Sequence, residues 1–274
     1  MRGDLTTLAN AKAWAGIATT NSDVIISQLI TRVSQVARSY CGRPSFLSTT
    51  YTESYDGTGD VTLPLRNWPV TSVASLSINE RLIQPAGSGW AGFTFDQWDG
   101  FSPGSPAFLQ LRGGRFLEGQ RNVAVTYTAG YLLTGEAQTV DPATHTITPI
   151  GPLGICAADA GCTYANGTPL VAVAATPAAG QYVPPSPFGL NPTTVYQFSA
   201  ADSGSAVILS YSYVPADLEG AVIELVAERV KYMARIGLRS QSSGAGGENT
   251  SYIVTDLPAW ARMSLQNYKM VVPL

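Results

Sequence analysis

Ser102 lies at the centre of Gly100-Phe-Ser-Pro-Gly104, which has the G-x-S-x-G spacing of a hydrolase nucleophile. In such enzymes the backbone N–H after the serine helps to bind the oxyanion of the reaction intermediate. Here that residue is Pro103, which has no N–H. His145 is the only histidine, and therefore the only imidazole available as a base, and it falls in a turn-rich segment. The sequence therefore argues against a serine hydrolase.

A second motif, from Gly87 to Gly92, matches the G-x-G-x-x-G string of dinucleotide-binding folds. That site needs a strand before the glycines and a helix after them, so that the pyrophosphate meets a helix N-terminus. Pro85 precedes this motif, and the β-like segment Phe93–Phe95 follows it. We therefore predict a plain turn rather than a cofactor site.

The cysteines and the paired acids do not form a convincing reactive centre either. Cys156 and Cys162 are separated by five residues and have no further ligands nearby, which argues against zinc. They could form a disulfide in an oxidising medium, and we favour two reduced thiols. Glu224 and Glu228 lie one helical turn apart, as on an ordinary solvated helix face. We predict no catalytic, cofactor or metal site and no enzyme, so function must lie in surfaces.

Composition narrows the class of protein further. Of 274 residues, 45 % are hydrophobic and only 13 % are charged, with a formal net charge of −3. The low charge argues against a disordered chain, and the slightly acidic balance argues against tight sequence-independent DNA binding. No apolar run approaches the roughly 18 residues that a membrane span needs. We expect a soluble protein that is used without export and has no membrane partner.

Two segments carry strong helical periodicity. Apolar residues recur at steps of three and four in Ser22–Cys41 and again in Pro215–Ile236. Each stripe must bury its face against something, so we predict that the two helices pack together. A short helix should end at Ala15, and a last helix should begin near Asp256. The residues expected in the shared helical core are Ile26, Leu29, Val33, Leu218, Val222 and Leu225.

The period changes to two from Ser48, and Asp56-Gly57-Thr58-Gly59 predicts the turn of a β-hairpin. Residues 134–205 hold nine of the 18 prolines and no Lys or Arg, and they predict short strands, with a further one over Val207–Tyr213. We therefore expect one core formed by residues 1–133 and 206–274, with an inserted domain at 134–205. The predicted fold class is α+β: a helical bundle core with a β-hairpin or small sheet, plus a small all-β sandwich or barrel.

Two blocks of sequence resemble a known family. One runs from LTTLANAKAWAGI through SYCGR and YTESYDGTGDVTLPLRNWPVTSVASLSI, that is, Leu5 to Ile78. The other joins VAVTYTAGY (Val123 to Tyr131) to VPADLEGAVIELVAERVKYMARIGLRSQS (Val214 to Ser242) across the insertion. Together they resemble the head–tail connector proteins of tailed bacteriophages, also called adaptor or head-completion proteins.

The resemblance implies a structural virion protein that is not an enzyme. It implies a ring of identical subunits, commonly dodecameric, seated between the portal protein and the next neck or tail component. Double-stranded DNA would pass through this ring without sequence-specific binding, and assembly would take place in the host cytoplasm.

In the resembling family the terminal segment commonly reaches the portal, and this chain offers parts for such an arm. Gln241–Thr250 is expected to be a flexible loop by composition. The candidate portal-binding residues are Trp260, Met263, Tyr268, Val271, Val272 and Leu274. The alternative is that the last helix only completes the subunit core.

A second hypothesis comes from the inserted segment alone. Its Gly, Pro and Tyr content also suits a phage surface adhesin or a glycan-binding β-protein, with Tyr164, Tyr182 and Tyr196 stacking on sugars. The same tyrosines could equally be strand packing.

Overall fold

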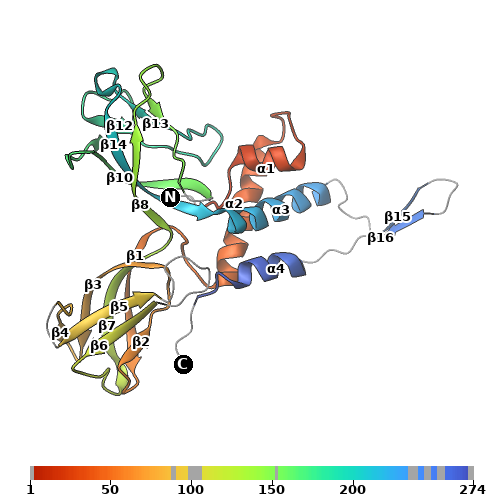
Figure 1. Ribbon diagram of the computed structural model, residues 1–274. Coiled ribbons are helices and arrows are strands. Elements are labelled where there is room, and N and C mark those ends of the chain that lie inside the picture. The colour runs from red at the N-terminus through yellow and green to blue at the C-terminus, as the bar shows by residue number, and fades with distance from the viewer. Residues whose placement is uncertain are drawn as a thin grey trace.

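The computed structural model describes residues 3–87, 91–97, 107–151, 154–233, 240–243, 248–251 and 257–270. Figure 1 shows three parts: a group of helices and two separate β regions that lie to one side of it. Each part has its own cluster of buried hydrophobic side chains. The chain leaves the helices after α2, builds both β regions and returns to the helices at α3.

The helices form as their end signals predict. The Thr7 side chain accepts a hydrogen bond from the N–H of Asn10 and caps the first helix. Gly16 and Gly42 follow the first two helices with φ of 70° and 68°, a left-handed conformation that suits glycine. The helices are α1 (Leu8–Ala15), α2 (Asp23–Cys41), α3 (Ala216–Met233) and α4 (Ala259–Gln266).

The first β region consists of two sheets that enclose a shared core. One sheet has the order β1-β7-β3-β4 and the other the order β2-β6-β5. Buried side chains from both sheets, including Tyr55, Leu76, Phe93 and Leu109, meet between them. The strands are β1 (Thr49–Gly57), β2 (Thr62–Pro64), β3 (Val70–Ile78), β4 (Arg81–Ile83), β5 (Gly92–Gln97), β6 (Ala107–Arg112) and β7 (Gly119–Ala129).

The predicted hairpin around Asp56–Gly59 is wrong. β1 pairs with β7, with Tyr51 opposite Tyr127, whereas β2 pairs with β6. The chain does turn at this point, but the strands on either side enter different sheets. Alternation along one strand shows that it is half-buried, but it does not identify its partner.

The second β region packs a three-stranded sheet, in the order β10-β14-β8, against a four-stranded sheet of short strands, in the order β11-β12-β13-β9. β14 then runs directly into α3. Val207, Leu209 and Tyr211 of β14 are buried in the core of this region, so its packing extends beyond residue 205. The elements are β8 (Leu132–Thr139), β9 (Thr146–Ile147), β10 (Gly154–Tyr164), β11 (Val171–Ala172), β12 (Gln181–Val183), β13 (Tyr196–Phe198), the 3₁₀ turn Ala200–Asp202 and β14 (Ala206–Pro215).

The predicted fold class is wrong in its emphasis on a helical bundle core. The residues that the structure describes are mostly β, at 40 % strand against 24 % helix, with several antiparallel sheets. The helices account for one of three buried clusters and share it with Phe46, Trp68 and Tyr131 from loops of the β parts. An apolar helical stripe shows that one face is buried, but it does not show which kind of element dominates the fold.

Another difference concerns Gln241–Thr250, predicted as a flexible loop. The structure has two antiparallel strands there, β15 (Ser240–Ser243) and β16 (Glu248–Ser251), with Ser240 opposite Ser251. Figure 1 shows this hairpin standing clear of the three main parts. Among the residues that the structure describes, no helix is long and apolar enough to cross a membrane.

Candidate functional site

The motifs that suggested chemistry do not come together. Gly100–Gly104 lies outside the described residues. Gly92 begins strand β5, so a strand and not a helix follows the glycine string. The backbone of His145 donates to Asp141 and accepts from Phe198, which places this histidine in a turn of the second β region. No three His, Cys, Asp or Glu side chains within the described ranges are grouped to hold a metal.

The cysteines are buried or half-buried free thiols. Cys156 and Cys162 both lie on β10. Burial raises the pKa of each of these two thiols to about 12 and that of Cys41 to about 11. All three are therefore protonated near neutral pH, which makes them poor nucleophiles and poor metal ligands.

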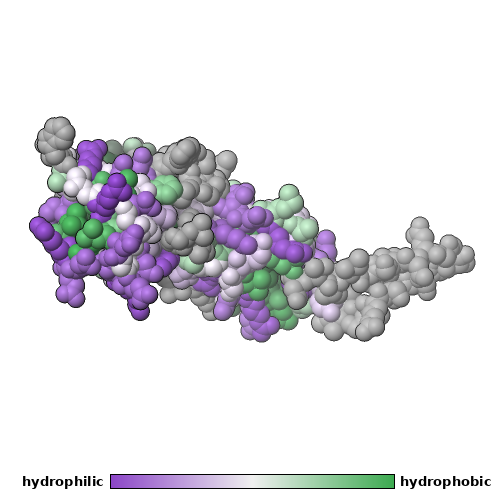
Figure 2. Space-filling model, turned by 90° about the horizontal axis from the view of Figure 1, so that it is seen from below, coloured by the Kyte–Doolittle hydropathy of each residue, from purple (hydrophilic) through white to green (hydrophobic). Residues whose placement is uncertain are grey.

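The most distinctive surface is on the helices, where α2 and α3 leave an apolar groove, here called the helical groove. It has a volume of about 230 Å³, and its apolar residues are accompanied by two arginines. Val36, which lines it, is 47 % exposed. Figure 2 shows hydrophobic atoms gathered over the helices on the visible face. The lining residues are Leu29, Arg32, Val33, Val36, Leu225, Arg229 and Leu257.

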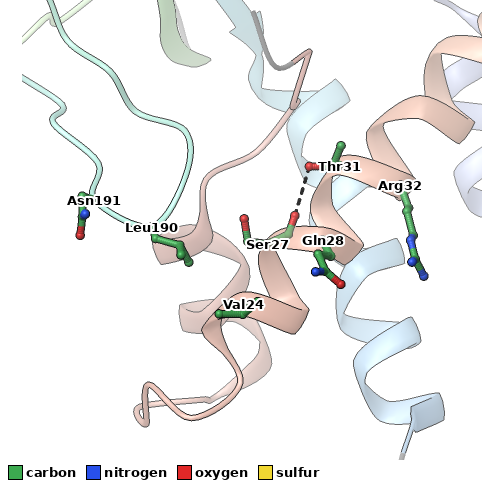
Figure 3. Close-up of a pocket in the computed structure, with 7 residues that line it drawn as sticks. All are labelled: Val24, Ser27, Gln28, Thr31, Arg32, Leu190 and Asn191. Atoms are coloured by element: carbon green, nitrogen blue, oxygen red, sulfur yellow. Dashed lines mark hydrogen bonds between the residues drawn. The ribbon is translucent and has the colours of Figure 1, made fainter.

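A second, larger hollow of about 500 Å³ lies on another side of α2. In Figure 3, Val24 and Ser27 of α2 lie on the side nearest a loop of the second β region that carries Leu190 and Asn191. The hydroxyl of Thr31 donates to the carbonyl of Ser27 at 3.2 Å. Arg32 borders both this hollow and the helical groove. The two hollows therefore flank one continuous stretch of α2.

The residues expected in the helical core are placed together, with one difference. Five of them are buried in one cluster: Ile26, Val33, Leu218, Val222 and Leu225. Leu29 is only half-buried and lines the helical groove instead. The apolar residues at helical spacing on α2 thus span a wider face than the one that is buried within the subunit.

The candidate arm residues divide into two groups. Trp260 and Met263 on α4 are 39 % and 72 % exposed, so they are accessible to a partner. Tyr268 is fully buried, stacks on Trp68 with ring centroids 6.2 Å apart and donates its hydroxyl proton to Asp217. It fixes the end of α4 to the body of the subunit. Val271, Val272 and Leu274 lie outside the described residues.

Arg43, which the sequence analysis did not single out, joins the helices to the first β region. Its guanidinium is buried, donates to the carbonyl oxygen of Trp68 and lies 4.8 Å and 5.0 Å from the ring centroids of Trp68 and Phe46. Burial lowers its pKa, and nearby Tyr131, Tyr51, Cys41 and Tyr127 oppose that effect. The only sequence signal was its position directly after the helix-ending Gly42.

A buried carboxylate joins α1 to α3 inside the helical part. Glu219 accepts hydrogen bonds from Thr6 at 3.1 Å and Asn10 at 2.7 Å, both at the same oxygen, Oε1. Burial raises the pKa of Glu219 although both hydrogen bonds act to lower it. The N-terminal segment is therefore fixed to α3 by polar contacts within the subunit.

The tyrosines considered for sugar stacking are occupied within the second β region. Tyr182 and Tyr196 are buried, and both donate to the carboxylate of Asp159, at 2.7 Å and 3.0 Å. Tyr164 donates to Asp202 at 2.6 Å. These contacts favour the packing interpretation over sugar stacking.

Comparison with known proteins supports the resemblance noted in the sequence. No curated protein matches the chain. The family model described as head completion protein matches residues 4–96, which cover α1, α2 and the strands from β1 into β5. The resemblance to phage head–tail connector and head-completion proteins is therefore confirmed, and residues 4–96 are similar to the head completion protein family.

Proposed function

We propose that this protein is a structural, non-enzymatic component of the neck of a tailed bacteriophage virion. It assembles in the host cytoplasm as a ring of identical subunits, commonly dodecameric in this family. The ring joins the portal protein to the next neck or tail component and extends the channel through which DNA passes without sequence-specific binding. The family match over residues 4–96 supports this role.

The observation that carries the proposal is the accessible apolar surface of the helices. Trp14 of α1 is 63 % exposed, and Val24 and Val36 of α2 are 57 % and 47 % exposed. The helical groove gathers further apolar side chains around Val36, which is typical of a surface that another protein covers. We assign the helical groove to contact between neighbouring copies, because its apolar lining suits a stable subunit interface.

We propose a portal-binding arm that no longer includes Tyr268. Trp260 and Met263 project from α4, whereas Tyr268 belongs to the subunit core. Val271, Val272 and Leu274 supply further apolar side chains beyond α4. Aromatic and Met side chains are enriched at protein interfaces, which makes the exposed pair the natural anchor of such an arm.

The experiment that tests self-association compares two neighbouring substitutions on α2. Val36→Glu puts a charge into the helical groove, whereas Gln35→Glu adds the same charge at the adjacent exposed position outside it. We expect Val36→Glu to abolish higher-order assembly, measured by light scattering after gel filtration, while both variants keep the wild-type melting temperature. Assembly of Val36→Glu equal to that of Gln35→Glu would show that copies meet elsewhere.

A further inference from the structure

A second groove lies beside β4 of the first β region. Figure 1 shows β4 at the side of this region that is away from the helices. It has a volume of about 450 Å³ and runs between β4 and the segment that follows β6. Figure 2 shows hydrophobic atoms surrounded by hydrophilic ones on this part of the molecule. We call it the arginine groove, and the residues that matter are Arg81, Leu82, Arg112, Arg115 and Leu117.

One wall of the arginine groove is the open edge of a sheet. β4 is the last strand in the order β1-β7-β3-β4. The turn between β3 and β4 has two residues, Asn79 and Glu80, with φ of 48° and 64°. In such a hairpin the flanking pair, Ile78 and Arg81, exchanges hydrogen bonds. The backbone N–H and C=O of the next residue, Leu82, therefore point away from β3 towards the groove.

At the end of β4, strand β5 closes the arginine groove through backbone hydrogen bonds. Phe93 donates its N–H to the carbonyl of Gln84 at 3.0 Å and accepts from the N–H of Ala86 at 2.7 Å. Gly92 permits this approach, because a Cβ there would lie 2.7 Å from the oxygen of Gln84. The two sheets are therefore joined at Gln84, whereas Leu82, two residues earlier, faces the groove.

The chemistry of the groove combines positive charge with apolar surface. Arg81 and Arg112 are exposed, and Arg115 uses one guanidinium nitrogen to donate to the carbonyl of Gly59 at 3.2 Å. Leu82 and Leu117 are 57 % and 56 % exposed. None of the described residues that line the groove is acidic. A polyanion such as DNA would satisfy the arginines but would leave both leucines uncovered.

We propose that the arginine groove binds an extended, acidic segment of a partner protein, which adds to the edge of β4. The backbone of this segment would bond the outward N–H and C=O of Leu82, as in other cases of strand addition to a sheet edge. Its carboxylates would pair with Arg81 and Arg112, and its alternate apolar side chains would cover Leu82 and Leu117. This assignment goes beyond the proposed function, and it does not depend on ring formation through the helices.

The test uses a fluorescein-labelled synthetic peptide, Glu-Leu-Glu-Val-Glu-Leu-Glu, and fluorescence anisotropy with the full chain. We expect saturable binding, and no binding of the matched peptide with Lys in place of Glu. Arg112→Glu should weaken binding by about tenfold or more, as the loss of a close charge pair does. Lys231→Glu makes the same charge change on α3, outside this groove, and should leave binding within about twofold.

Two further measurements separate strand addition from simple charge attraction. Leu82→Pro removes the outward N–H at an edge position where proline is tolerated, and Leu82→Ala removes only the side chain. Binding should be lost in the first variant and only weakened in the second, and bound peptide should slow hydrogen exchange over residues 81–83. Failure of the acidic peptide to bind, equal effects of Arg112→Glu and Lys231→Glu, or full competition by a short DNA duplex would each overturn the proposal.

Discussion

Glu219 in the helical part and Glu136 in the second β region are both held by hydrogen bonds, yet their pKa values move in opposite directions. Glu219 is buried and has two donors at one oxygen, and its pKa is raised. For Glu136, burial also acts to raise the pKa, but four donors outweigh it and the pKa is lowered. The balance between burial and the number of donors therefore sets the direction of the shift.

The geometry of the four donors explains this difference. Oε1 of Glu136 accepts from Gln138 and from the backbone N–H of Ile150, while Oε2 accepts from Tyr211 and from the backbone N–H of Gly151. Both oxygens of Glu136 are thus engaged, and its charge is compensated locally. At Glu219 the described hydrogen bonds reach only Oε1. The second β region thus stabilises the charged form of Glu136, whereas burial in the helical part disfavours the charged form of Glu219.

The largest expected effect comes from a charge in the helical core. Leu225→Asp places a carboxylate among Val222, Val33 and their buried neighbours, which should cost about 3–5 kcal/mol of folding free energy. Circular dichroism melting should show loss of the helical transition, while a protease-resistant fragment from the second β region persists, because that region has its own core. Leu225→Met is the matched control. Unchanged melting of Leu225→Asp would contradict this packing.

Removal of the second β region gives the next largest effect, and it tests the proposed domain boundaries. The N–H of Tyr213 donates to the carbonyl of Tyr131 at 3.2 Å, so the two ends of this region are adjacent. Replacing residues 132–212 with a short Gly/Ser linker should leave a folded helical part with a lower melting temperature.

A deletion of residues 134–205 is the informative comparison. It keeps β14 but removes its partners, which exposes Val207, Leu209 and Tyr211. We expect this shorter deletion to aggregate more than the deletion of 132–212, as measured by soluble yield. Equal behaviour of the two would show that 134–205 is a self-contained insertion, as the sequence predicts.

The smallest effects come from changing each carboxylate to an amide. In Glu136→Gln the NH₂ group replaces one of two oxygens, each of which accepts from two donors, so the change should cost about 1–2 kcal/mol near neutral pH. Glu219→Gln keeps both bonds at Oε1 and removes a buried charge, so its melting temperature near neutral pH should rise.

The pH dependence provides the control for both variants. A lowered folded pKa gives stability that is present above the unfolded pKa and is lost as the pH falls through the folded value, as for Glu136. For Glu219 the folded pKa is raised, so stability decreases as the pH rises from the unfolded towards the folded value. In melting curves between about pH 3 and pH 8, each variant should lose the pH dependence of stability that its own glutamate contributes. The same pH response in both variants would contradict the opposite pKa shifts of Glu136 and Glu219.

Much of the local structure could be predicted from the sequence. Period and capping residues placed α1 and α2 to within a residue or two, because Thr7, Gly16 and Gly42 act through the backbone next to them. The argument that a β-like segment follows the glycine string was equally local, and β5 does begin at Gly92. The family resemblance also came from the sequence, and it is confirmed for residues 4–96.

The candidate surfaces could be predicted only in part. Trp260 and Met263 were identified because large apolar residues on a short amphipathic helix are conspicuous, but Tyr268 has the same character and is buried. The arginine groove was not foreseen, because Arg81 and Arg112 come from β4 and β6, which belong to different sheets. No sequence pattern indicates which side chains two separate strands bring together.

The sequence by itself determined where helices and many strands form, because those choices depend on neighbours within a few residues. Only the tertiary structure decided that β1 pairs with β7, that the fold is mostly β, and that Arg43 is buried between Phe46 and Trp68. It also decided the opposite titration of Glu136 and Glu219. Strand partners, burial and the donors around a carboxylate come from residues far apart in the chain, and only folding brings them within hydrogen-bond distance.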